Sequence, residues 1–482
     1  MLTTKELDAI WESQEHRRKK QKRLRKYYKG DHDICHRSAK HADGKPKANV
    51  PTGFAQYIID MFVGAMTANP YQLSRLDEAG PDTADLYADI ARDTHIDSVD
   101  VENLRNALVC GYGLELHEFV DSKLNVMPER PEKWALIRDE NDEIVVASTR
   151  FVLPAYSMFQ GQMISSATEI MYTYDATTKQ GHRRIYNATV KGEWEQFESR
   201  KHFYGQVPVV EWRATDDRES MLSDALLRQI DEYDDIDSLS GDDIRNVSDA
   251  LLKIKGISGS WIKENEDAIL RMRVLPLPDD ADAEYLSKST DTQRVADRLT
   301  RCREAIHTMG CVPDIHQVTG ATGSTSGIAL KLKFMPMQQR AEAMFKQLQK
   351  SLRKRIDVLN SITSKATKTK IENYQIIMQF NMPVNRIEEW ANIGALTDIV
   401  THRTQLELLS DIDDADSELK GLEDEHINKA EVQGVNQSPE AAAAAQDVQV
   451  AQTMPKVDGQ IQTTLDIIGD RILAAVTRAN SK

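Results

Sequence analysis

The sequence has no hydrophobic run long enough to cross a membrane. A helix needs about 18–20 predominantly apolar residues to span a bilayer, whereas the best candidate, residues 57–66, contains Asp60 and stops before Pro70. The first six residues also lack the basic and then apolar pattern of a secretory signal. We therefore expect a protein that is made and kept in a cytoplasm-like compartment, with no membrane among its partners.

Cysteines are few and show no paired spacing, so we expect reduced thiols instead of a disulfide framework. The four are Cys35, Cys110, Cys302 and Cys311. Cys35 has an alternative interpretation, as a ligand in a zinc site together with His32, His36 and His41. No second ligand pair with finger-like spacing completes such a site. We therefore interpret these four residues as turn residues near a helix end and expect no metal.

Catalytic motifs are absent as well. The glycine-rich loop at residues 319–327 lacks the lysine of a phosphate-binding P-loop, because Ser324 follows Gly323. The same loop places Thr325 where a nucleophile elbow needs its central serine. An acidic run from Asp411 imitates a calcium loop, but Leu419 stands where the sharp turn needs glycine. We expect no enzyme, no cofactor and no metal site.

Net positive charge is also missing. With 61 basic and 76 acidic residues the formal charge is −15, which argues against a protein that grips nucleic acid, since DNA affinity comes mainly from neutralised phosphates. One dense basic run, residues 17–29, ends a predicted helix over residues 3–29 at the helix-stop signal Gly30. It is either a solvated helix face or an arm that binds phosphate or a partner.

The 482 residues exceed one compact core, so two to four domains are expected. Before residue 222, helices are predicted within 47–70 and over 97–110. The stretch 113–213 contains short alternating runs separated by Gly, Asp and Asn, a pattern typical of antiparallel strands. The predicted strands are Tyr112–Val120, Ile144–Val152, Glu169–Tyr174, Arg184–Val190 and Val207–Arg213.

After residue 222 the pattern becomes mainly helical. An acidic helix (223–249) and a second helix (291–309) flank a small β module with predicted strands at Leu251–Ile257, Leu270–Leu277 and Glu284–Leu286. The loop 319–327 has no bulky side chain and is expected to be mobile. A long helix follows over 326–365, and Pro336 predicts a kink in it. A strand at 374–380 and helices to about residue 430 complete the chain.

Four stretches in this order resemble the portal, or head–tail connector, family of long-tailed bacteriophages over roughly residues 10–430. Their positions are Tyr27–His32 with Asn49–Pro51 and Tyr57–Pro70; Ser223–Ser238 with Leu251–Gly256; Ser326–Lys331; and Asn381–Asn385 with Thr401–Leu409 and Glu418–Glu425. The resemblance implies an α+β, mainly helical portal fold that assembles as a ring, usually a dodecamer, around a central channel.

The resemblance also implies a domain plan. Residues 1–222 resemble the α+β wing, 223–250 and 291–314 the stem helices, and 251–290 the clip. Residues 315–327 resemble the tunnel loop, 328–370 the long kinked helix of the wing, 371–432 the crown and 433–482 a C-terminal tail.

Partners follow from the same resemblance. They are further copies of the chain, double-stranded DNA without sequence specificity, the terminase, the major capsid or scaffolding protein, and a head-completion or tail adaptor protein. The implied location is the portal vertex of the virion, after assembly in the host cytoplasm. Two other classes stay open: an enzyme acting on nucleic acid, such as a nuclease or motor subunit, and a scaffold without a DNA channel.

An acidic bore would repel DNA evenly from all sides, whereas a basic bore would bind it at every step. This reconciles the negative charge with a DNA conduit. The stem carboxylates predicted to line the channel are Asp231, Asp234, Asp235, Asp242 and Asp243. The tunnel loop predicted to face DNA comprises Thr319, Gly320, Ala321, Thr322, Gly323, Ser324, Thr325 and Ser326, with Lys331 and Lys333 either touching phosphates or forming ion pairs. The clip residues predicted to contact terminase or adaptor are Pro276, Asp279, Asp280 and Asp282.

Overall fold

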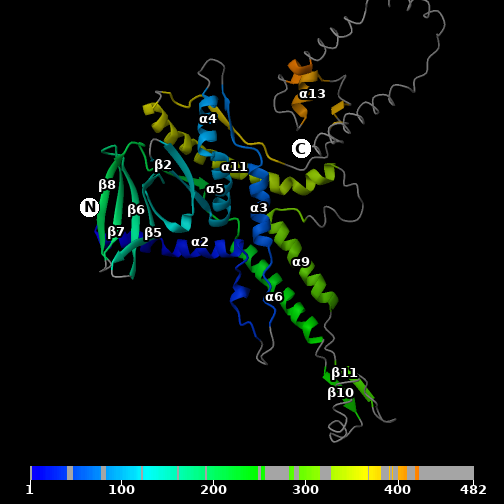
Figure 1. Cartoon of the computed structure of the whole chain (residues 1–482). Helices are drawn as coiled ribbons and strands as arrows, with labels where there is room; N and C mark the ends of the chain where they lie inside the picture. Colours follow the sequence, from blue (N-terminus) through cyan, green and yellow to red (C-terminus); the bar gives the residue numbers. More distant parts are fainter. Residues whose placement is uncertain are drawn as a thin grey trace, which may run out of the picture. The chain divides into compact units, whose positions relative to one another are not determined.

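A computed structural model of residues 1–482 divides into two compact units, Met1–Val384 and Asn385–Lys482, which are described separately (Figure 1). The structure describes residues 3–40, 47–76, 83–120, 123–159, 162–189, 193–247, 251–255, 282–286, 292–314, 327–366, 369–381, 390, 393–394, 400–409 and 418–422.

The first unit begins with two helices end to end where the sequence predicted one. Helix α1 (Thr4–Ser13) is closed at its start by a capping box, in which the Thr3 amide donates to Glu6 at 2.7 Å. Helix α2 (Glu15–Tyr28) follows after Gln14, whose backbone leaves the helical conformation. The predicted stop is confirmed, because Gly30 has a φ of 77°, which glycine adopts without a Cβ penalty.

Two antiparallel sheets lie beside these helices. One has the strand order β3–β2–β9 and the other β4–β5–β6–β7–β8. The β character predicted for 113–213 is thus confirmed, whereas β3, β4 and β8 were not predicted. The strands are β2 (Tyr112–Val120), β3 (Lys123–Glu129), β4 (Trp134–Arg138), β5 (Ile144–Phe159), β6 (Gln162–Asp175), β7 (Gln180–Ala188), β8 (Trp194–His202) and β9 (Val209–Arg213).

Three more helices and a small sheet complete the body of this unit. The predicted helices are α3 (Phe54–Thr67) and α5 (Ile96–Cys110), whereas α4 (Ala84–Thr94) was not predicted. Strand β1 (Gln72–Arg75) pairs antiparallel with β12 (Tyr374–Ile377). Residues 374–377 therefore belong to the first unit, and the structure divides the chain after Val384. Short 3-10 turns lie at η1 (Asp33–His36) and η2 (Pro131–Lys133).

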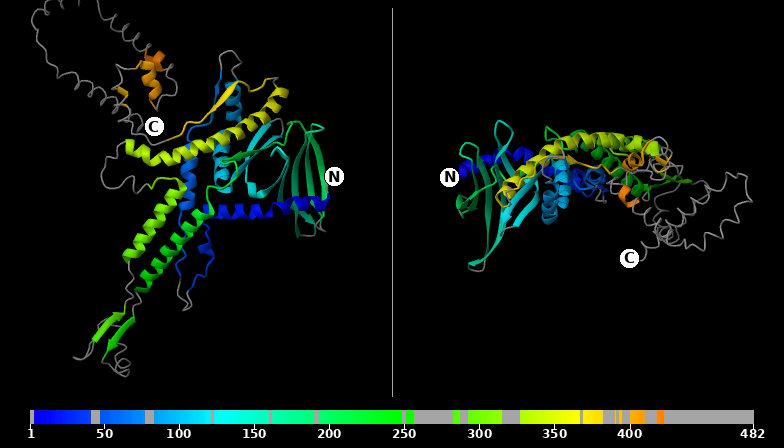
Figure 2. Two further views of the ribbon diagram at one scale, coloured as in Figure 1. Left: turned by 180° about the vertical axis from the view of Figure 1, so that it is seen from behind. Right: turned by 90° about the horizontal axis from the view of Figure 1, so that it is seen from above.

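A helical pair leads away from this body. Helices α6 (Asp224–Val247) and α9 (Thr292–Gly310) pack side by side in Figures 1 and 2. Between them in sequence, β10 (Leu251–Lys255) pairs antiparallel with β11 (Asp282–Leu286). The sequence predicted both helices and both strands, while the third predicted strand, Leu270–Leu277, lies outside the described residues.

Helix α11 (Gly327–Ala366) runs across the unit and carries Pro336 within it. Figures 1 and 2 show the helix bent in its N-terminal part, as a proline there predicts. Its apolar stripe is buried as the 3.6-residue period requires, with Ala341, Leu348, Leu352, Ile356 and Leu359 all withdrawn from solvent.

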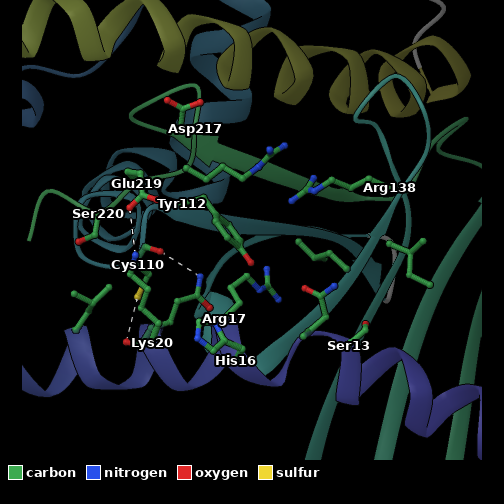
Figure 3. Close-up of a pocket in the computed structure, with 16 residues that line it drawn as sticks. Ser13, His16, Arg17, Lys20, Cys110, Tyr112, Arg138, Asp217, Glu219 and Ser220 are labelled. Carbon is green, nitrogen blue, oxygen red and sulfur yellow. Dashed lines mark hydrogen bonds and ion pairs between the residues drawn. The ribbon is translucent and has the colours of Figure 1, made fainter. Parts of the chain in front are cut away.

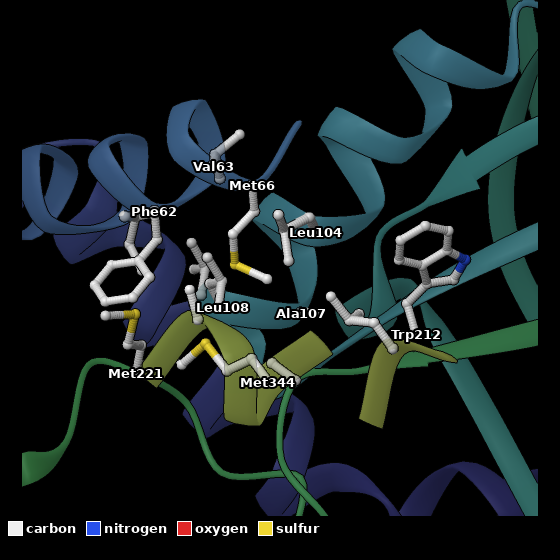
Figure 4. Close-up of a cluster of buried hydrophobic side chains, with 14 of the residues drawn as sticks. Phe62, Val63, Met66, Leu104, Ala107, Leu108, Trp212, Met221 and Met344 are labelled. Carbon is white, nitrogen blue, oxygen red and sulfur yellow. The ribbon is translucent and has the colours of Figure 1, made fainter. Parts of the chain in front are cut away.

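The main core lies where α3, α5, β9 and α11 meet. Figure 4 shows Phe62 and Met66 from α3, Leu104 and Leu108 from α5, and Met344 from α11 converging on one cluster. Burial of each such side chain contributes roughly 1.5–3 kcal/mol. This shared core makes α11 part of the same folding unit as the N-terminal helices.

A buried ionic network fastens α11 beside this core. Arg355 has no exposed side-chain surface and donates to both oxygens of Glu115 on β2, with its Nε 2.9 Å from Oε1 and an Nη 2.5 Å from Oε2. The same guanidinium pairs with Asp100 of α5 and lies over the Trp212 ring of β9. Glu115 also accepts hydrogen bonds from Asn103 and from the Trp212 indole.

The two carboxylates differ in how fully Arg355 compensates their burial. Burial raises the pKa of Asp100 to about 7 despite the guanidinium. Burial also acts on Glu115, but Arg355 and His117 outweigh it and lower its pKa to about 2. Arg355 therefore compensates the burial of Glu115 more fully than that of Asp100.

The C-terminal unit is described over few residues. Its helix α13 (His402–Leu408) has Thr401 as its N-cap residue, and the Thr401 hydroxyl accepts a hydrogen bond from the Thr404 amide at 3.3 Å.

Replacing Arg355 by Met tests the network. The variant leaves Asp100 buried without its guanidinium and Glu115 with His117 alone beside it, so we expect the full chain to lose about 3–5 kcal/mol of unfolding free energy in urea denaturation. Lys354→Met is the matched control on the same helix. Lys354 pairs with Glu143 at the surface, and its loss should cost less than about 1 kcal/mol. Equal effects of the two variants would contradict the assigned role of Arg355.

Candidate functional site on helices α6 and α9

Helix α6 begins at a capped turn and buries one face against the body of the unit. The Ser223 hydroxyl accepts from the Leu226 amide at 3.2 Å, as an N-cap residue does. Leu226, Leu227 and Ile230 are buried in the main core. On the side of α9, Ile306 joins the same core, and an ion pair of 3.2 Å between Arg298 and Glu232 links the two helices.

A second face of α6 is covered by the last residues of α2 and the segment that follows them. We call residues 27–40 and 47–52 the N-terminal strap. The Tyr27 hydroxyl donates to Asp231 at 2.8 Å, and Arg37 pairs with Asp235.

Farther along the strap, backbone amides continue the same pairing. The amide of Val50 donates to Ser238 at 3.0 Å, and that of Ala48 to Asp242 at 2.7 Å. Positions 231, 235, 238 and 242 are separated by three or four residues and therefore form one stripe of α6.

At the centre of the strap a histidine is enclosed. His32 Nδ1 lies 2.6 Å from Asp234 Oδ2, and His32 Nε2 lies 3.1 Å from the carbonyl oxygen of Tyr27. Both ring nitrogens face acceptors, so both must donate, and the ring is an imidazolium. The Tyr27 ring stacks on it at 4.7 Å. Burial alone would lower the pKa of His32, but the hydrogen bond and charge of Asp234 outweigh it and raise the pKa.

These contacts correct part of the sequence prediction for the acidic helix. Asp234 is completely buried inside the subunit and Asp242 nearly so. Their carboxylates bind the strap and are not available to line a channel. From the sequence alone, all carboxylates of this helix look equivalent. Nothing in their spacing along the helix marks which of them the strap covers.

Asp231, Asp235 and Asp243 remain partly exposed. Asp235 pairs with Arg37 of the strap, which compensates its negative charge, whereas Asp231 accepts a hydrogen bond from the neutral Tyr27 hydroxyl. Across the pair, α6 carries eight carboxylates against two arginines, whereas α9 carries four arginines against two carboxylates. The acidic character therefore belongs to α6 and not to α9.

The structure describes only some of the remaining predicted site residues. Lys331 and Lys333 are exposed in the first turns of α11, and Lys333 lines a cavity of about 490 Å³ with Pro336 and His307. Asp282 opens β11. The tunnel-loop residues 319–326, and Pro276, Asp279 and Asp280, lie outside the described residues.

Most basic side chains of α2 form contacts within the subunit. Arg17 and Arg18 donate to the backbone carbonyls of Trp134 and Glu132, and Arg25 pairs with the Glu132 carboxylate at 2.5 Å. The exposed side pairs too: Lys19 with Glu15, Lys20 with Glu219, Arg23 with Asp33, and Lys26 with Asp31. These contacts favour a structural role of the run over a phosphate-binding arm.

A family model described as "Phage portal protein, SPP1 Gp6-like" matches residues 7–432. The chain belongs to this portal family. Its part in DNA packaging follows from that membership, and the family is structural, not catalytic. No curated protein matches the chain.

Two solved structures are similar to the portal subunit at low identity. One is titled "Virion of native gene transfer agent (GTA) particle", with 12% identity, 74% of this chain and 89% of the other covered, and a TM-score of 0.40. The other is titled "Neck of native GTA particle computed with C12 symmetry", with 13% identity, the same coverage and a TM-score of 0.38.

No group of three or more His, Cys, Asp or Glu side chains is arranged within the described residues to hold a metal ion. No helix in that part of the portal subunit combines the length and apolar composition that crossing a bilayer requires.

The ion pair between His32 and Asp234 predicts that the contribution of the strap to the unfolding free energy depends on pH. Because folding raises the pKa of His32, its stabilising effect is complete below the unfolded value of about 6.5 and is lost as pH rises through the folded value. We expect the unfolding free energies of wild type and His32→Gln to differ most at acidic pH and to converge as pH rises above neutrality.

His36→Gln is the control for this measurement, because His36 pairs with Asp31 at the surface and should contribute little at any pH. A difference between wild type and His32→Gln that stays constant from pH 5 to pH 9 would contradict a charged His32.

Proposed function

We propose that copies of this portal subunit, about twelve, close head-to-tail into a ring around a central channel. Double-stranded DNA is packaged through this channel and later leaves through it, at one vertex of the virion. The observation that carries the proposal is the family match over residues 7–432. A head-to-tail contact whose rotation closes on itself gives a ring without further components.

Within such a ring, α6 and α9 form the stem that surrounds the duplex. Asp243, which is partly exposed and lies outside the stripe that the strap covers, supplies negative charge toward the bore. The four aspartates that bind the strap lie toward the outside of the helix pair. A carboxylate surface gives DNA phosphates no favourable site at which to stop, since tight binding comes from neutralised phosphates. The basic side chains of α9 temper this repulsion without forming a continuous cationic track.

The other parts take the roles that portal membership suggests. Residues 1–222 with 328–370 form the wing, 251–290 the clip that terminase and later a head-completion or tail adaptor contact, and 371–432 the crown. Residues 319–326, followed by Lys331 and Lys333, form a tunnel loop that contacts phosphates without reading sequence. The capsid or scaffolding protein surrounds the ring, which is assembled in the host cytoplasm.

Mass and shape test the ring. The subunit has a mass of 54.5 kDa, so light scattering after size exclusion should give about twelve times this value for the assembled protein. Negative-stain images should show a central hole. A protein that stays monomeric or dimeric under all conditions, or particles without a hole, would contradict the proposal.

Reversing one stem charge tests the bore. In Asp243→Lys every copy adds a cation to the channel, so the ring should hold short duplex DNA with an affinity that falls steeply with salt, with a log–log slope on the order of several units. Asp93→Lys changes the same charge on the exposed face of α4 and serves as control. If both rings bind duplex equally, the stem carboxylates do not face the DNA.

A further inference from the structure

A cavity of about 690 Å³ lies where α2, the C-terminal end of α5, β4 and the loop before α6 meet (Figure 3). The loop is held there by the Met221 amide, which donates to Leu108 at 2.9 Å, and by the Ser220 hydroxyl, which donates to Val109 at 2.7 Å. Gly111, with a φ of 91°, lets the loop pass this closely, because a Cβ there would overlap the carbonyl of Arg218. The cavity is thus built by packed elements.

Three residues that line this cavity each carry a buried hydrogen-bond donor without an acceptor in the described part of the chain. The Tyr112 hydroxyl, the Arg17 Nε and one Nη of Arg138 are buried, and no acceptor within the described ranges reaches them. Tyr112 itself is only 2% exposed. Figure 3 shows Arg17, Tyr112 and Arg138 converging from α2, β2 and β4. Buried donors are nearly always paired in folded proteins, so a cluster of three calls for an explanation.

Positive charge exceeds negative charge around these donors. Arg138, Arg213 and Arg218 share the two carboxylates of Glu211 and Asp142, with Nε or Nη atoms of all three lying 2.8 Å from Glu211. Arg17 adds a fourth guanidinium. In the described part of the chain it forms no ion pair; it donates to the Trp134 carbonyl and lies over the Tyr112 ring.

The environment of Arg17 is correspondingly unfavourable for its charge. Burial lowers the pKa of Arg17 to about 10, and the nearby guanidinium of Arg138 lowers it too, while Glu211 opposes both. An anion between the two guanidinium groups would remove this repulsion.

We propose that this cavity binds an oxyanion, a phosphate or a carboxylate group, between Arg17, Arg138 and Tyr112. Guanidinium groups can only donate and a phenol hydroxyl can donate one hydrogen bond, which matches the lone pairs of either group. The volume lies in the range of small-ligand sites. Nothing in the portal role assigns this cavity, which lies away from α9 and the β10–β11 hairpin.

A free oxyanion or an acidic side chain fits this cavity better than a nucleic acid duplex does. Tyr112 and the orphaned donor atoms are withdrawn from the surface, where a duplex would present its phosphates. The rim also carries Asp217 and Glu219, of which Glu219 pairs with Lys20 at 3.3 Å. These carboxylates would repel a row of phosphates, while a single anionic group can pass them.

Thermal unfolding of the full chain tests the site with two probes, inorganic phosphate and a tetraglutamate peptide, each compared with chloride at matched ionic strength. A ligand that binds only the folded chain raises the unfolding midpoint with the logarithm of its concentration relative to its Kd, and a rise of about 2 °C or more is expected for at least one probe. A response to phosphate alone identifies a free phosphate as the source. A response to the peptide alone identifies an acidic side chain of another protein.

Arg17→Gln should abolish the response, whereas Lys19→Gln, which removes the same charge from the exposed side of α2, should keep it. Tyr112→Phe guards against a folding defect, because it removes only an unpaired hydroxyl. This variant should be at least as stable as wild type in chloride, yet bind the probe about tenfold more weakly. No response of wild type to either probe, or equal responses of the Arg17 and Lys19 variants, would overturn the site.

Discussion

The buried contact between Arg355 and Glu115 is the constraint on which the rest of the first unit depends. A guanidinium without exposed surface must keep its carboxylate partners, because removing one leaves an uncompensated charge in a medium that stabilises it poorly. Sliding α11 by one turn against β2 and α5 would break every one of these bonds at once. The network therefore fixes the register of the long helix, and the apolar stripe of α11 then fills the core from that fixed position.

The strap on α6 applies the same physics to a second helix. A stripe of aspartates and one serine receives a hydroxyl, a guanidinium, an imidazolium and backbone amides from residues 27–52. These carboxylates of α6 bind the N-terminal strap to the stem. What stays exposed is a smaller negative surface than the composition suggests, set beside an α9 that carries net positive charge.

Arginines in this subunit are thus used in two ways. Some arginines of α2 and α11 bind carboxylates or carbonyls of neighbouring elements and hold these elements together. Arg25 and Arg355 are examples. Arg17 and Arg138 meet at a cavity where the donors outnumber the acceptors. The difference lies in the count of partners within reach, which depends on how α2, β4 and the loop before α6 come together.

The family and most of the local elements could be predicted from the sequence, although α4, β3, β4 and β8 were not. The stop at Gly30, the stripe of α11 with its Pro336 bend, and the acidic helix before a small β module all follow from periodicity and backbone chemistry, which act within a few residues. Only the tertiary structure decided which charges face solvent. Asp234 and Asp243 look equivalent in sequence, yet one meets His32 across 202 positions and is buried, because burial depends on what packs opposite, and spacing along one helix does not record that.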